Sequence, residues 1–260
     1  MTDFASKPKT QIAPSLLSAD FMNLARDVAM IEQGAPDWLH VDVMDGHLVP
    51  NLTIGVPAVK ALRAITPAPL DVHLMIDNPE EQLDWYIDAG ADLITLHLEC
   101  AGIQKRCSGN PIVFDDDLQS AASGQGSSVY ITELNQPELI ISLIQRIKTA
   151  GRKAGLAITP GTEAKLVLPF LKHLDLVMIM SVHPGFGGQN LIESTLTKVS
   201  LISEAAISLN PDILIEVDGG INISTAPQAV AAGANLLVAG NAIFAEPDPL
   251  AALAALRAAI

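Results

Sequence analysis

The sequence contains few basic residues and only two cysteines. Of its 260 residues, 15 are Lys or Arg and 29 are Asp or Glu, so the formal net charge is −14. A protein this acidic repels nucleic-acid phosphates and anionic membrane surfaces, and we expect neither as a partner. Cys100 and Cys107 are too few for a disulfide framework, and no cluster of zinc-finger spacing surrounds them.

A long apolar run is also missing from the start of the chain. Residues 1–11 contain no segment that could form a signal-peptide core or a membrane span. We therefore expect a soluble, cytoplasmic protein. A small phosphorylated substrate is compatible with the negative charge, because backbone N–H groups can bind an anion locally.

The sequence does contain a series of eight short apolar runs with helical segments between them. The runs are residues 12–14, 38–43, 70–76, 93–98, 154–158, 176–180, 213–217 and 236–239. Nearly continuous apolar strands are typical of a parallel sheet that helices cover on its outer face. The length also suits an α/β barrel of about 250 residues. We therefore predict an α/β fold, a single (β/α)8 TIM barrel domain over residues 1–260.

Local patterns support a repeated βα unit. Three of the runs follow similar tetrapeptides that resemble a helix C-cap leading into a strand. These are Gly34-Ala35-Pro36-Asp37, Ala89-Gly90-Ala91-Asp92 and Ala232-Gly233-Ala234-Asn235. Apolar residues of one intervening segment, from Leu139 to Ile147, fall on a single helical face that ends before Gly151.

The fourth and fifth runs are separated by a much longer segment than the other neighbours. Residues 101–135 contain several loop-like stretches, among them 108–111, the acidic triplet 115–117 and the Gly/Ser-rich 124–128. We predict that 101–135 is an insertion in the βα loop after the fourth strand. Such a loop lies on the catalytic face of a barrel, so the insertion is a lid, an interface element or a surface excursion.

Polar residues occupy the ends of the second and third runs. His40, Asp42 and Met44 share one side of the second strand, and Asp71, His73 and Met75 share one side of the third. That side faces the barrel interior if Val41 and its neighbours face the helices. Imidazoles and carboxylates that converge from adjacent strand ends suit a divalent transition metal.

The seventh run ends in Asp218, followed by Gly219 and Gly220. Asp218 is either a turn-forming Asp-Gly residue or the fourth member of a two-His, two-carboxylate set. Two carboxylates that face each other across a sugar can remove a proton from carbon and return one to the opposite face. A carboxylate with a pKa of about 3.9 is a weak base towards carbon, so a nearby metal must stabilise the developing charge.

Glycine-rich loops follow the sixth and eighth runs. The sixth run leads into the loop around Gly185, and the eighth into Gly240 and Asn241. Such loops present N–H groups to a phosphate, and the loops after strands seven and eight are the usual phosphate site in these barrels.

With these motifs the sequence resembles the ribulose-phosphate 3-epimerase family. The matching segments cover nearly the whole chain outside 101–135. They are residues 13–20, 40–47, 49–51, 71–75, 184–189 and 216–220.

The resemblance implies a metal-dependent isomerase of the pentose phosphate pathway, acting in carbohydrate metabolism. Its reaction interconverts D-ribulose 5-phosphate and D-xylulose 5-phosphate at C3 through an enediolate held by one divalent metal ion. His40, Asp42, His73 and Asp218 would be the ligands, and Asp42 and Asp218 would also exchange the protons. The family resemblance favours a homo-oligomer.

The resemblance also implies the residues that surround the substrate. Those that would contact the sugar or its phosphate are Ser15, His73, Gly185, Phe186, Gly187, Gly188, Gly219, Gly220, Gly240 and Asn241. Met44, Met75 and Met180 would form an apolar wall that excludes water from the reacting carbon. Asn241 stands where the family usually has a serine, and we expect altered phosphate affinity as a result.

Several alternatives stay open. Zinc, iron(II), manganese and cobalt all suit two imidazoles and two carboxylates. The same residues would serve a six-carbon substrate such as allulose 6-phosphate. Lyases and decarboxylases on this barrel usually need a lysine at the reacting centre, whereas Lys153 begins the fifth run on the opposite face. A barrel retained only for binding would be expected to lack a ligand or an acid/base residue, and all four are present.

Overall fold

The computed structural model describes residues 9–101, 133–134 and 136–260. Over these residues eight parallel strands form one sheet in the order β1-β8-β7-β6-β5-β4-β3-β2. A parallel bridge between Ser15 and His40 joins β1 to β2 and brings the two edges of the sheet together. The strands are β1 Gln11–Pro14, β2 Leu39–Met44, β3 Leu70–Met75, β4 Leu93–His97, β5 Lys153–Ile158, β6 Leu176–Met180, β7 Leu214–Asp218 and β8 Leu236–Ala239.

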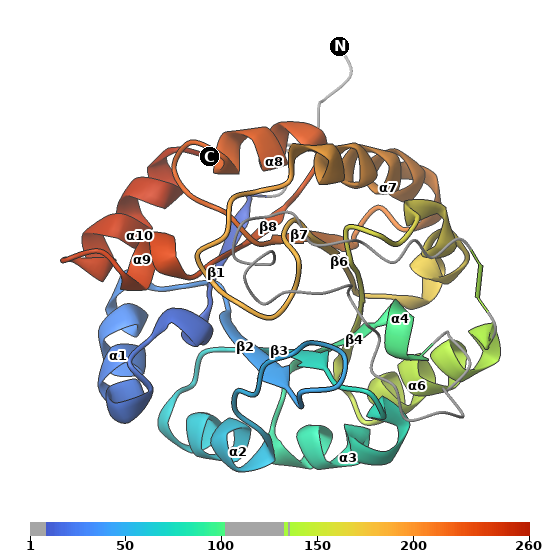
Figure 1. Ribbon diagram of the computed structural model, residues 1–260, viewed down its shortest axis with the longest axis horizontal. Helices are drawn as coiled ribbons and strands as arrows, with labels where there is room; N and C mark the ends of the chain where they lie inside the picture. Colours follow the sequence, from blue (N-terminus) through green and yellow to red (C-terminus); the bar gives the residue numbers. More distant parts are fainter. Residues whose placement is uncertain (1–8, 102–132, 135) are drawn as a thin grey trace.

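Each strand lies within one residue of a predicted run at both ends, so the predicted TIM barrel is confirmed. Figure 1 looks into the barrel and shows the helices arranged around the strands. The α-helices are α1 Leu24–Ile31, α2 Val56–Ile65, α3 Pro79–Ala89, α4 Leu98–Ala101, α6 Pro137–Thr149, α7 Leu196–Leu209, α8 Ala226–Ala232, α9 Asn241–Phe244 and α10 Pro249–Ala258. Between β5 and β6 the chain forms two 3₁₀ helices instead, Ala164–Leu166 and Leu168–His173.

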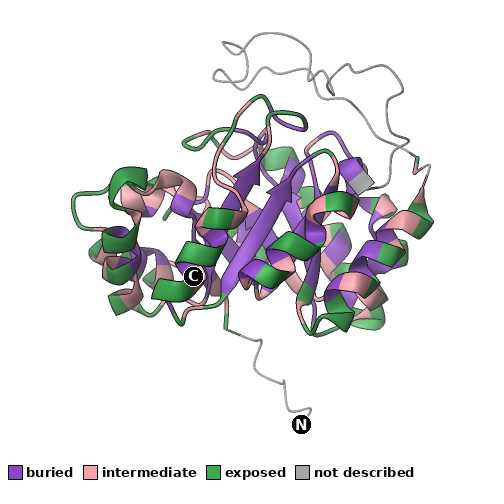
Figure 2. Cartoon of the chain, turned by 90° about the horizontal axis from the view of Figure 1, so that it is seen from below, coloured by how far each residue is buried: buried purple, intermediate pink, exposed green. Residues whose placement is uncertain are grey.

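The strands separate two kinds of core. Outward-facing residues such as Val41 and Val43 pack with the helices in one large apolar cluster, as predicted. A smaller apolar cluster that includes Met178 and Val238 fills part of the barrel interior. Figure 2 shows that the strands are buried almost throughout. Polar side chains from β2, β3, β4 and β7 occupy the rest of the interior, where they are shielded from water.

At the N-terminal end of the barrel, the same type of side chain-to-backbone hydrogen bond occurs once in each of the four successive pairs of strands. A side-chain oxygen just before an even-numbered strand accepts the backbone N–H of a residue in or beside the preceding odd-numbered strand. The pairs are Asp37 with Ile12 at 3.0 Å, Asp92 with Leu70 at 2.9 Å, Asp175 with Ala154 at 2.8 Å and Asn235 with Ile215 at 2.7 Å. Three of these residues end the predicted tetrapeptides, so that motif ties successive strands together.

The first tetrapeptide differs from its expected helix cap. Gly90 and Gly233 adopt the left-handed conformation at the ends of α3 and α8, as expected. In the first motif the left-handed residue is Ala35, with φ 47°, and not Gly34. A Cβ at Gly34 would lie 2.8 Å from Cδ2 of Leu253 on α10, so a side chain at position 34 would require the end of the Leu253 side chain to shift.

The predicted insertion over 101–135 falls almost entirely outside the described residues, as does Cys107. Its position between α4 and α6 agrees with a βα connection after β4. Its role as a lid or an interface element stays a prediction. None of the helices in the described ranges is long and apolar enough to cross a membrane.

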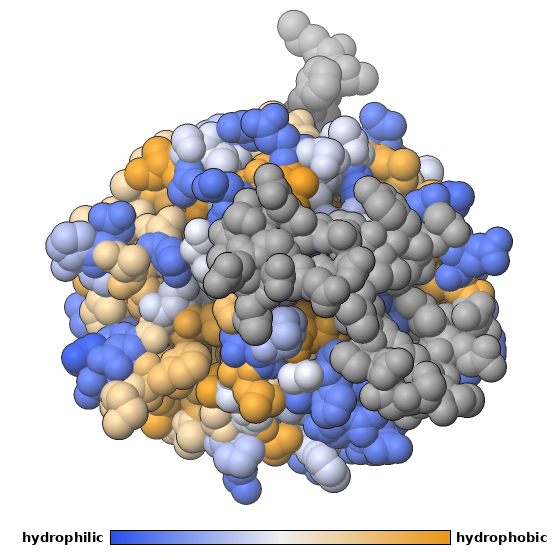
Figure 3. Space-filling model, in the orientation of Figure 1, coloured by the Kyte–Doolittle hydropathy of each residue, from blue (hydrophilic) through white to orange (hydrophobic). Residues whose placement is uncertain are grey.

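The surface mixes polar and apolar residues. On the face shown in Figure 3, hydrophilic residues are spread around the rim and apolar residues lie between them in small groups. Large exposed apolar residues come from separate elements, for example Trp85 on α3 and Ile207 on α7. Scattered residues of this kind are ordinary in globular proteins.

Candidate metal and acid/base site

A cavity of about 310 Å³ lies at the C-terminal ends of the strands. Most of the predicted site residues line it: Ser15, Asp42, Met44, Met75, Met180, Gly185, Phe186, Gly187, Gly188, Asp218, Gly219, Gly220, Gly240 and Asn241. His40 and His73 are fully buried and contact the two aspartates from below the cavity surface. The structure therefore brings together residues from six different strands or the loops that follow them.

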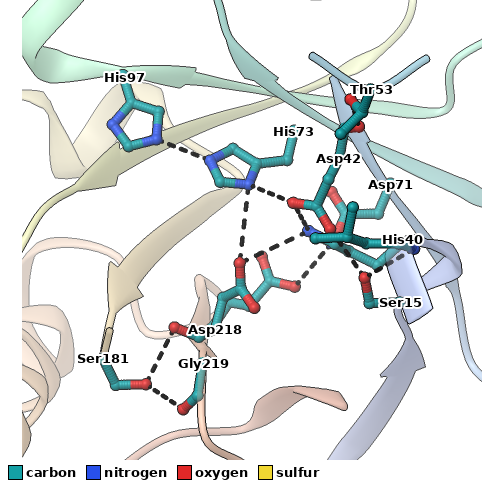
Figure 4. Close-up of polar contacts among 12 residues, drawn as sticks. Ser15, His40, Asp42, Thr53, Asp71, His73, His97, Ser181, Asp218 and Gly219 are labelled. Atoms are coloured by element: carbon teal, nitrogen blue, oxygen red, sulfur yellow. Dashed lines mark hydrogen bonds and ion pairs between the residues drawn. The ribbon is translucent and has the colours of Figure 1, made fainter. Parts of the chain in front are cut away.

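The two histidines and two aspartates form one compact cluster (Figure 4). Asp42 Oδ1 lies 3.3 Å from His40 Nε2 and 3.1 Å from His73 Nδ1. Asp218 Oδ2 lies 3.9 Å from His40 Nε2 and 3.8 Å from His73 Nδ1. Each residue thus offers one atom to a common point, and the four atoms lie within 4.8 Å of one another.

The cluster fits a divalent metal ion. Ligands about 2.0–2.2 Å from an ion are separated from one another by roughly 3–4 Å, and the four nitrogen–oxygen distances of the cluster, 3.1–3.9 Å, lie in that range. His40 Nε2 is buried and has no hydrogen-bond partner among the described residues, although it points at both aspartates. A buried nitrogen without a partner is costly unless something binds it, so His40 has a free ligand atom. Residues that can bind one metal ion are therefore present.

A buried acid fixes the orientation of His40. Its Nδ1 lies 2.6 Å from Asp71 Oδ2, which is a hydrogen-bond length and directs Nε2 towards the cluster. Glu216 Oε1 lies 3.7 Å from the same Nδ1. Burial and then the neighbouring Asp71 carboxylate raise the pKa of Glu216 well above its usual value, which favours the neutral form of this side chain.

The two aspartates of the cluster have opposite pKa shifts in the protein without a bound ion. Burial would raise the pKa of Asp42, but His40 and then His73 outweigh it and hold this pKa below its usual value. Burial and the Asp42 carboxylate raise the pKa of Asp218 to about 7. At neutral pH the metal-free protein therefore has Asp42 ionised, whereas Asp218 is protonated in about half of the molecules.

The pKa values of His40 and His73 also shift in opposite directions. Burial opposes protonation of His40, yet the carboxylates of Asp42 and Asp71 raise its pKa well above the usual value. Burial is the main reason that the pKa of His73 falls to about 4. His73 is neutral at pH 7, which is the form of histidine that binds a metal.

Glycines shape the turn that follows Asp218. Gly219 and Gly220 have φ values of 118° and 65°, and a Cβ at Gly220 would collide with the backbone nitrogen of Leu191. The Ser181 hydroxyl donates to the carbonyl of Gly219 at 2.6 Å. This turn therefore fixes the position of Asp218 at the C-terminal end of β7.

The loop between β6 and α7 is held over one side of the cavity. The Gln189 amide donates to the carbonyls of His183 at 2.7 Å and Phe186 at 2.8 Å. From the other side, Asn51 donates to the carbonyl of Gly185 at 2.7 Å. Asn241 accepts a 2.6 Å hydrogen bond from the Ser18 hydroxyl through Oδ1, which leaves its N–H₂ group next to Gly188.

The three methionines of the predicted wall all line the cavity but do not form one cluster. Met44 and Met75 pack with Leu48 and Cys100. Met180 belongs to the apolar cluster of the barrel interior. The wall therefore has two parts, and Cys100 is an ordinary apolar neighbour of one of them.

Several buried polar residues around the cluster were not predicted as site residues. Asp71 shares the inward side of β3 with His73, but its position alone indicated no partner. Glu216 lies in the matching segment 216–220, but the resemblance implies no role for it. His97 lies within the run 93–98, which reads as a plain apolar strand, and Glu99 follows that run. The pairing of β3 with β4 brings His97 to the cluster.

The profile of the Ribulose-phosphate 3 epimerase family matches residues 11–109 and 121–244 of this chain. A ribulose-phosphate 3-epimerase of Mycobacterium bovis is 43% identical over 246 residues, which are 95% of this chain and 91% of that protein. The enzyme of the same name from Bacillus subtilis is 39% identical over 95% of this chain and 98% of its own length. A chloroplastic ribulose-5-phosphate-3-epimerase of Arabidopsis thaliana is 39% identical over 98% of this chain and 79% of that protein.

Solved structures with much lower identity share the fold. A 3-keto-L-gulonate-6-phosphate decarboxylase from Vibrio cholerae superposes with a TM-score of 0.62 at 14% identity, covering 97% of both chains. A 3-hexulose-6-phosphate synthase superposes with a TM-score of 0.59 at 19% identity, covering 97% of this chain and all of the other. At such identities the likeness concerns the barrel alone.

Proposed function

This chain belongs to the ribulose-phosphate 3-epimerase family, and we propose that it interconverts D-ribulose 5-phosphate and D-xylulose 5-phosphate by inversion at C3. This activity is a step of the pentose phosphate pathway and makes the protein an isomerase acting on carbohydrates. The observation that carries the proposal is the pairing of Asp42 and Asp218, which face the same two histidines from opposite strands, β2 and β7.

The two aspartates are assigned as the acid/base pair. One carboxylate removes the C3 proton from one face of the sugar, and the other aspartic acid returns a proton to the opposite face. The opposite pKa shifts of the two carboxyls in the metal-free protein support this division, because they show that the environments of Asp42 and Asp218 differ, as those of a proton acceptor and a proton donor must. In the reverse reaction the two residues exchange roles.

We assign His40, Asp42, His73 and Asp218 as the ligands of one divalent ion. When bound, the ion supplies positive charge that stabilises the negative charge developing on the oxygens beside C3. Zinc, iron(II), manganese and cobalt each suit this mixed nitrogen and oxygen set. The apolar side chains of Met44, Met75 and Met180 exclude water from the reacting carbon.

The remaining cavity residues are assigned to the substrate. Ser15 contacts the sugar, because its hydroxyl already donates a 2.8 Å hydrogen bond to Asp42 at the cavity surface. The phosphate end is assigned to the loops after β6, β7 and β8. They contribute Gly185, Phe186, Gly187, Gly188, Gly219, Gly220, Gly240 and Asn241. His73 is buried beneath the cavity surface, where it would hold the ion.

No observation favours lyase chemistry. Lysine is absent from the described residues that line the cavity, and Lys153 begins β5 at the opposite end of the barrel. A cytoplasmic location and a homo-oligomeric assembly stay predictions.

A coupled assay tests the function. Protein stripped with a chelator is given each candidate metal in turn, and formation of D-xylulose 5-phosphate from D-ribulose 5-phosphate is followed. We expect metal-dependent turnover. If no metal restores turnover of the five-carbon substrate, the proposed substrate is wrong, and allulose 6-phosphate is the next substrate to assay.

A further inference from the structure

A second buried polar cluster lies behind the proposed metal site, on the side of β4 (Figure 4). His73 Nε2 lies 2.8 Å from His97 Nε2, and His97 Nδ1 lies 2.9 Å from Glu99 Oε2. Both histidines are completely buried, and Glu99 is 3% exposed. The proposed proton transfer uses neither His97 nor Glu99, so their burial in a polar network needs another explanation.

The contact between the two imidazoles is a hydrogen bond. Their ring centroids are 4.9 Å apart, and the ring planes differ by 23°. With the two Nε2 atoms only 2.8 Å apart, the rings must meet edge to edge, along the direction of the nitrogen lone pairs. One of the two nitrogens carries the proton and donates the hydrogen bond, and the other accepts the hydrogen bond with its lone pair.

The metal site determines the direction of this bond. The Nδ1 atom of His73 faces Asp42 and Asp218, so it must keep its lone pair free to bind an ion. The proton of a neutral His73 then lies on Nε2 and is donated to His97 Nε2. His97 consequently has its own proton on Nδ1, where Glu99 Oε2 accepts it.

Glu99 ends the hydrogen-bonded series that runs from His73 through His97, and its carboxylate can only accept hydrogen bonds. The backbone N–H of Thr159 donates to Glu99 Oε1 at 2.7 Å, and the Thr162 hydroxyl donates to the same oxygen. Burial opposes ionisation, but His97, Thr162 and Thr159 together lower the pKa of Glu99 to about 2, so it is a carboxylate. Lys198 on α7 fixes the segment after β5 by donating to the carbonyls of Pro160 and Thr162, both at 2.6 Å.

We propose that Glu99 is a positioning residue for the metal site, acting through His97 to keep the proton of His73 on Nε2 and its Nδ1 free for the ion. This inference rests on the proposed metal-dependent function. With this role for Glu99, each of the two histidine ligands has its ring orientation fixed by a buried carboxylate. His40 is oriented directly by Asp71, and His73 is oriented by Glu99 through one intervening imidazole.

The substitution Glu99→Gln tests the donor-to-acceptor direction of the hydrogen bonds that run from His73 through His97 to residue 99. Its carbonyl oxygen is needed by the N–H of Thr159, so the NH₂ group must face His97 Nδ1. His97 then has to accept there and carry its proton on Nε2, which opposes a proton on His73 Nε2. His73 is forced to protonate Nδ1, and the metal loses a ligand. Outer-sphere changes of this kind typically weaken metal binding by about 10- to 100-fold.

Thr95→Val provides a matched control. Thr95 lies on β4 opposite His73 in the sheet register, is completely buried, and its hydroxyl has no hydrogen-bond partner among the described residues. The substitution changes one polar atom in the same layer of the barrel without touching the chain from His73 to Glu99. Metal binding should stay within about twofold of the parent protein.

The experiment measures the Kd of cobalt(II) for the chelator-stripped parent protein, Glu99→Gln and Thr95→Val, using the visible absorption of the bound ion. We expect Glu99→Gln alone to bind about 10- to 100-fold more weakly. Equal Kd values for Glu99→Gln and the parent would overturn the inference. The ratio is independent of turnover, so a parent protein that binds cobalt but produces no xylulose 5-phosphate would refute the proposed function and leave the inference intact.

A second measurement covers the case in which Glu99→Gln fails to fold. Nitrogen-15 NMR of the zinc-loaded parent protein reports which ring nitrogen of each histidine carries a proton. The inference requires His73 to be protonated on Nε2 and His97 on Nδ1. A zinc-loaded protein in which His97 carries its proton on Nε2 would contradict it.

Discussion

Asp42 and Asp218 face the same pair of histidines but differ in their own hydrogen bonds. Asp42 Oδ2 accepts a 2.8 Å hydrogen bond from Ser15. Among the residues that the structure describes, no hydrogen bond to the Asp218 carboxylate is found, and this side chain is 14% exposed to the cavity. The environment therefore stabilises the charge of Asp42 and favours a proton on Asp218, which is the asymmetry that a two-residue proton transfer needs.

The substitution Asp218→Asn should preserve the fold and stop proton exchange on one face of the sugar. General acid/base groups typically contribute about 10²–10⁴-fold to a rate, so kcat should fall by that factor. Exchange of the C3 hydrogen with solvent should persist in one epimer only. Asp42→Asn should leave the opposite epimer exchanging. Activity of Asp218→Asn within a few-fold of the parent would exclude its proposed role.

Metal affinity should decrease as the pH falls below 7. Burial and the Asp42 carboxylate raise the pKa of Asp218 to about 7 in the metal-free protein, so below this pH an ion must displace a proton from Asp218. Each displaced proton weakens apparent binding about tenfold per pH unit. Titration with cobalt(II) at pH 8, 7 and 6 measures this effect. A Kd that stays constant from pH 8 to pH 6 would show that Asp218 is already ionised.

Much of the barrel could be predicted from the sequence, because a strand buried on both faces is a short apolar run and each run has a clear start. Asp42 and Asp218 could also be predicted, because each lies within the last three residues of its strand. The chain from His73 through His97 to Glu99 could not. His97 follows apolar residues in β4, and only the alignment of β3 with β4 places it against His73. Glu99 is held in turn by the backbone N–H of Thr159, which lies after β5.

The left-handed residue before β2 is a second feature that the local sequence could not predict. The motif predicts that the glycine takes the left-handed conformation at the helix end, whereas Ala35 takes it and Gly34 instead lies against the Leu253 side chain. A local pattern cannot reveal a contact with a helix more than two hundred residues away in the sequence.

Gly220→Ala should destabilise the protein much more than Gly151→Ala. Both glycines have similar positive φ values, 65° and 74°. An added Cβ at Gly220 would collide with the Leu191 backbone, whereas at Gly151 it meets nothing within 4 Å. We expect losses in the free energy of unfolding of about 2–4 kcal/mol and about 1 kcal/mol respectively, measured by urea denaturation. Equal losses would mean that the Leu191 segment moves freely.

Asn241→Ala should raise the KM for D-ribulose 5-phosphate by about 2- to 10-fold, the cost of one hydrogen bond, and change kcat by less than about twofold. The reason is its position beside Ser18 and Gly188, at the end of the cavity assigned to the phosphate. Steady-state kinetics separate the two constants. A large fall in kcat with an unchanged KM would mean that Asn241 acts on the reacting carbon and not on the phosphate.

The most direct test of two-aspartate proton transfer is turnover of D-ribulose 5-phosphate in D₂O by metal-loaded protein, with the C3 position of the product analysed by NMR after the first turnovers. Separate aspartates predict that D-xylulose 5-phosphate carries deuterium at C3, because the proton that enters comes from a residue equilibrated with solvent. A product that retains the protium of the substrate at C3 would show that a single group carries the proton between the faces and would contradict the account.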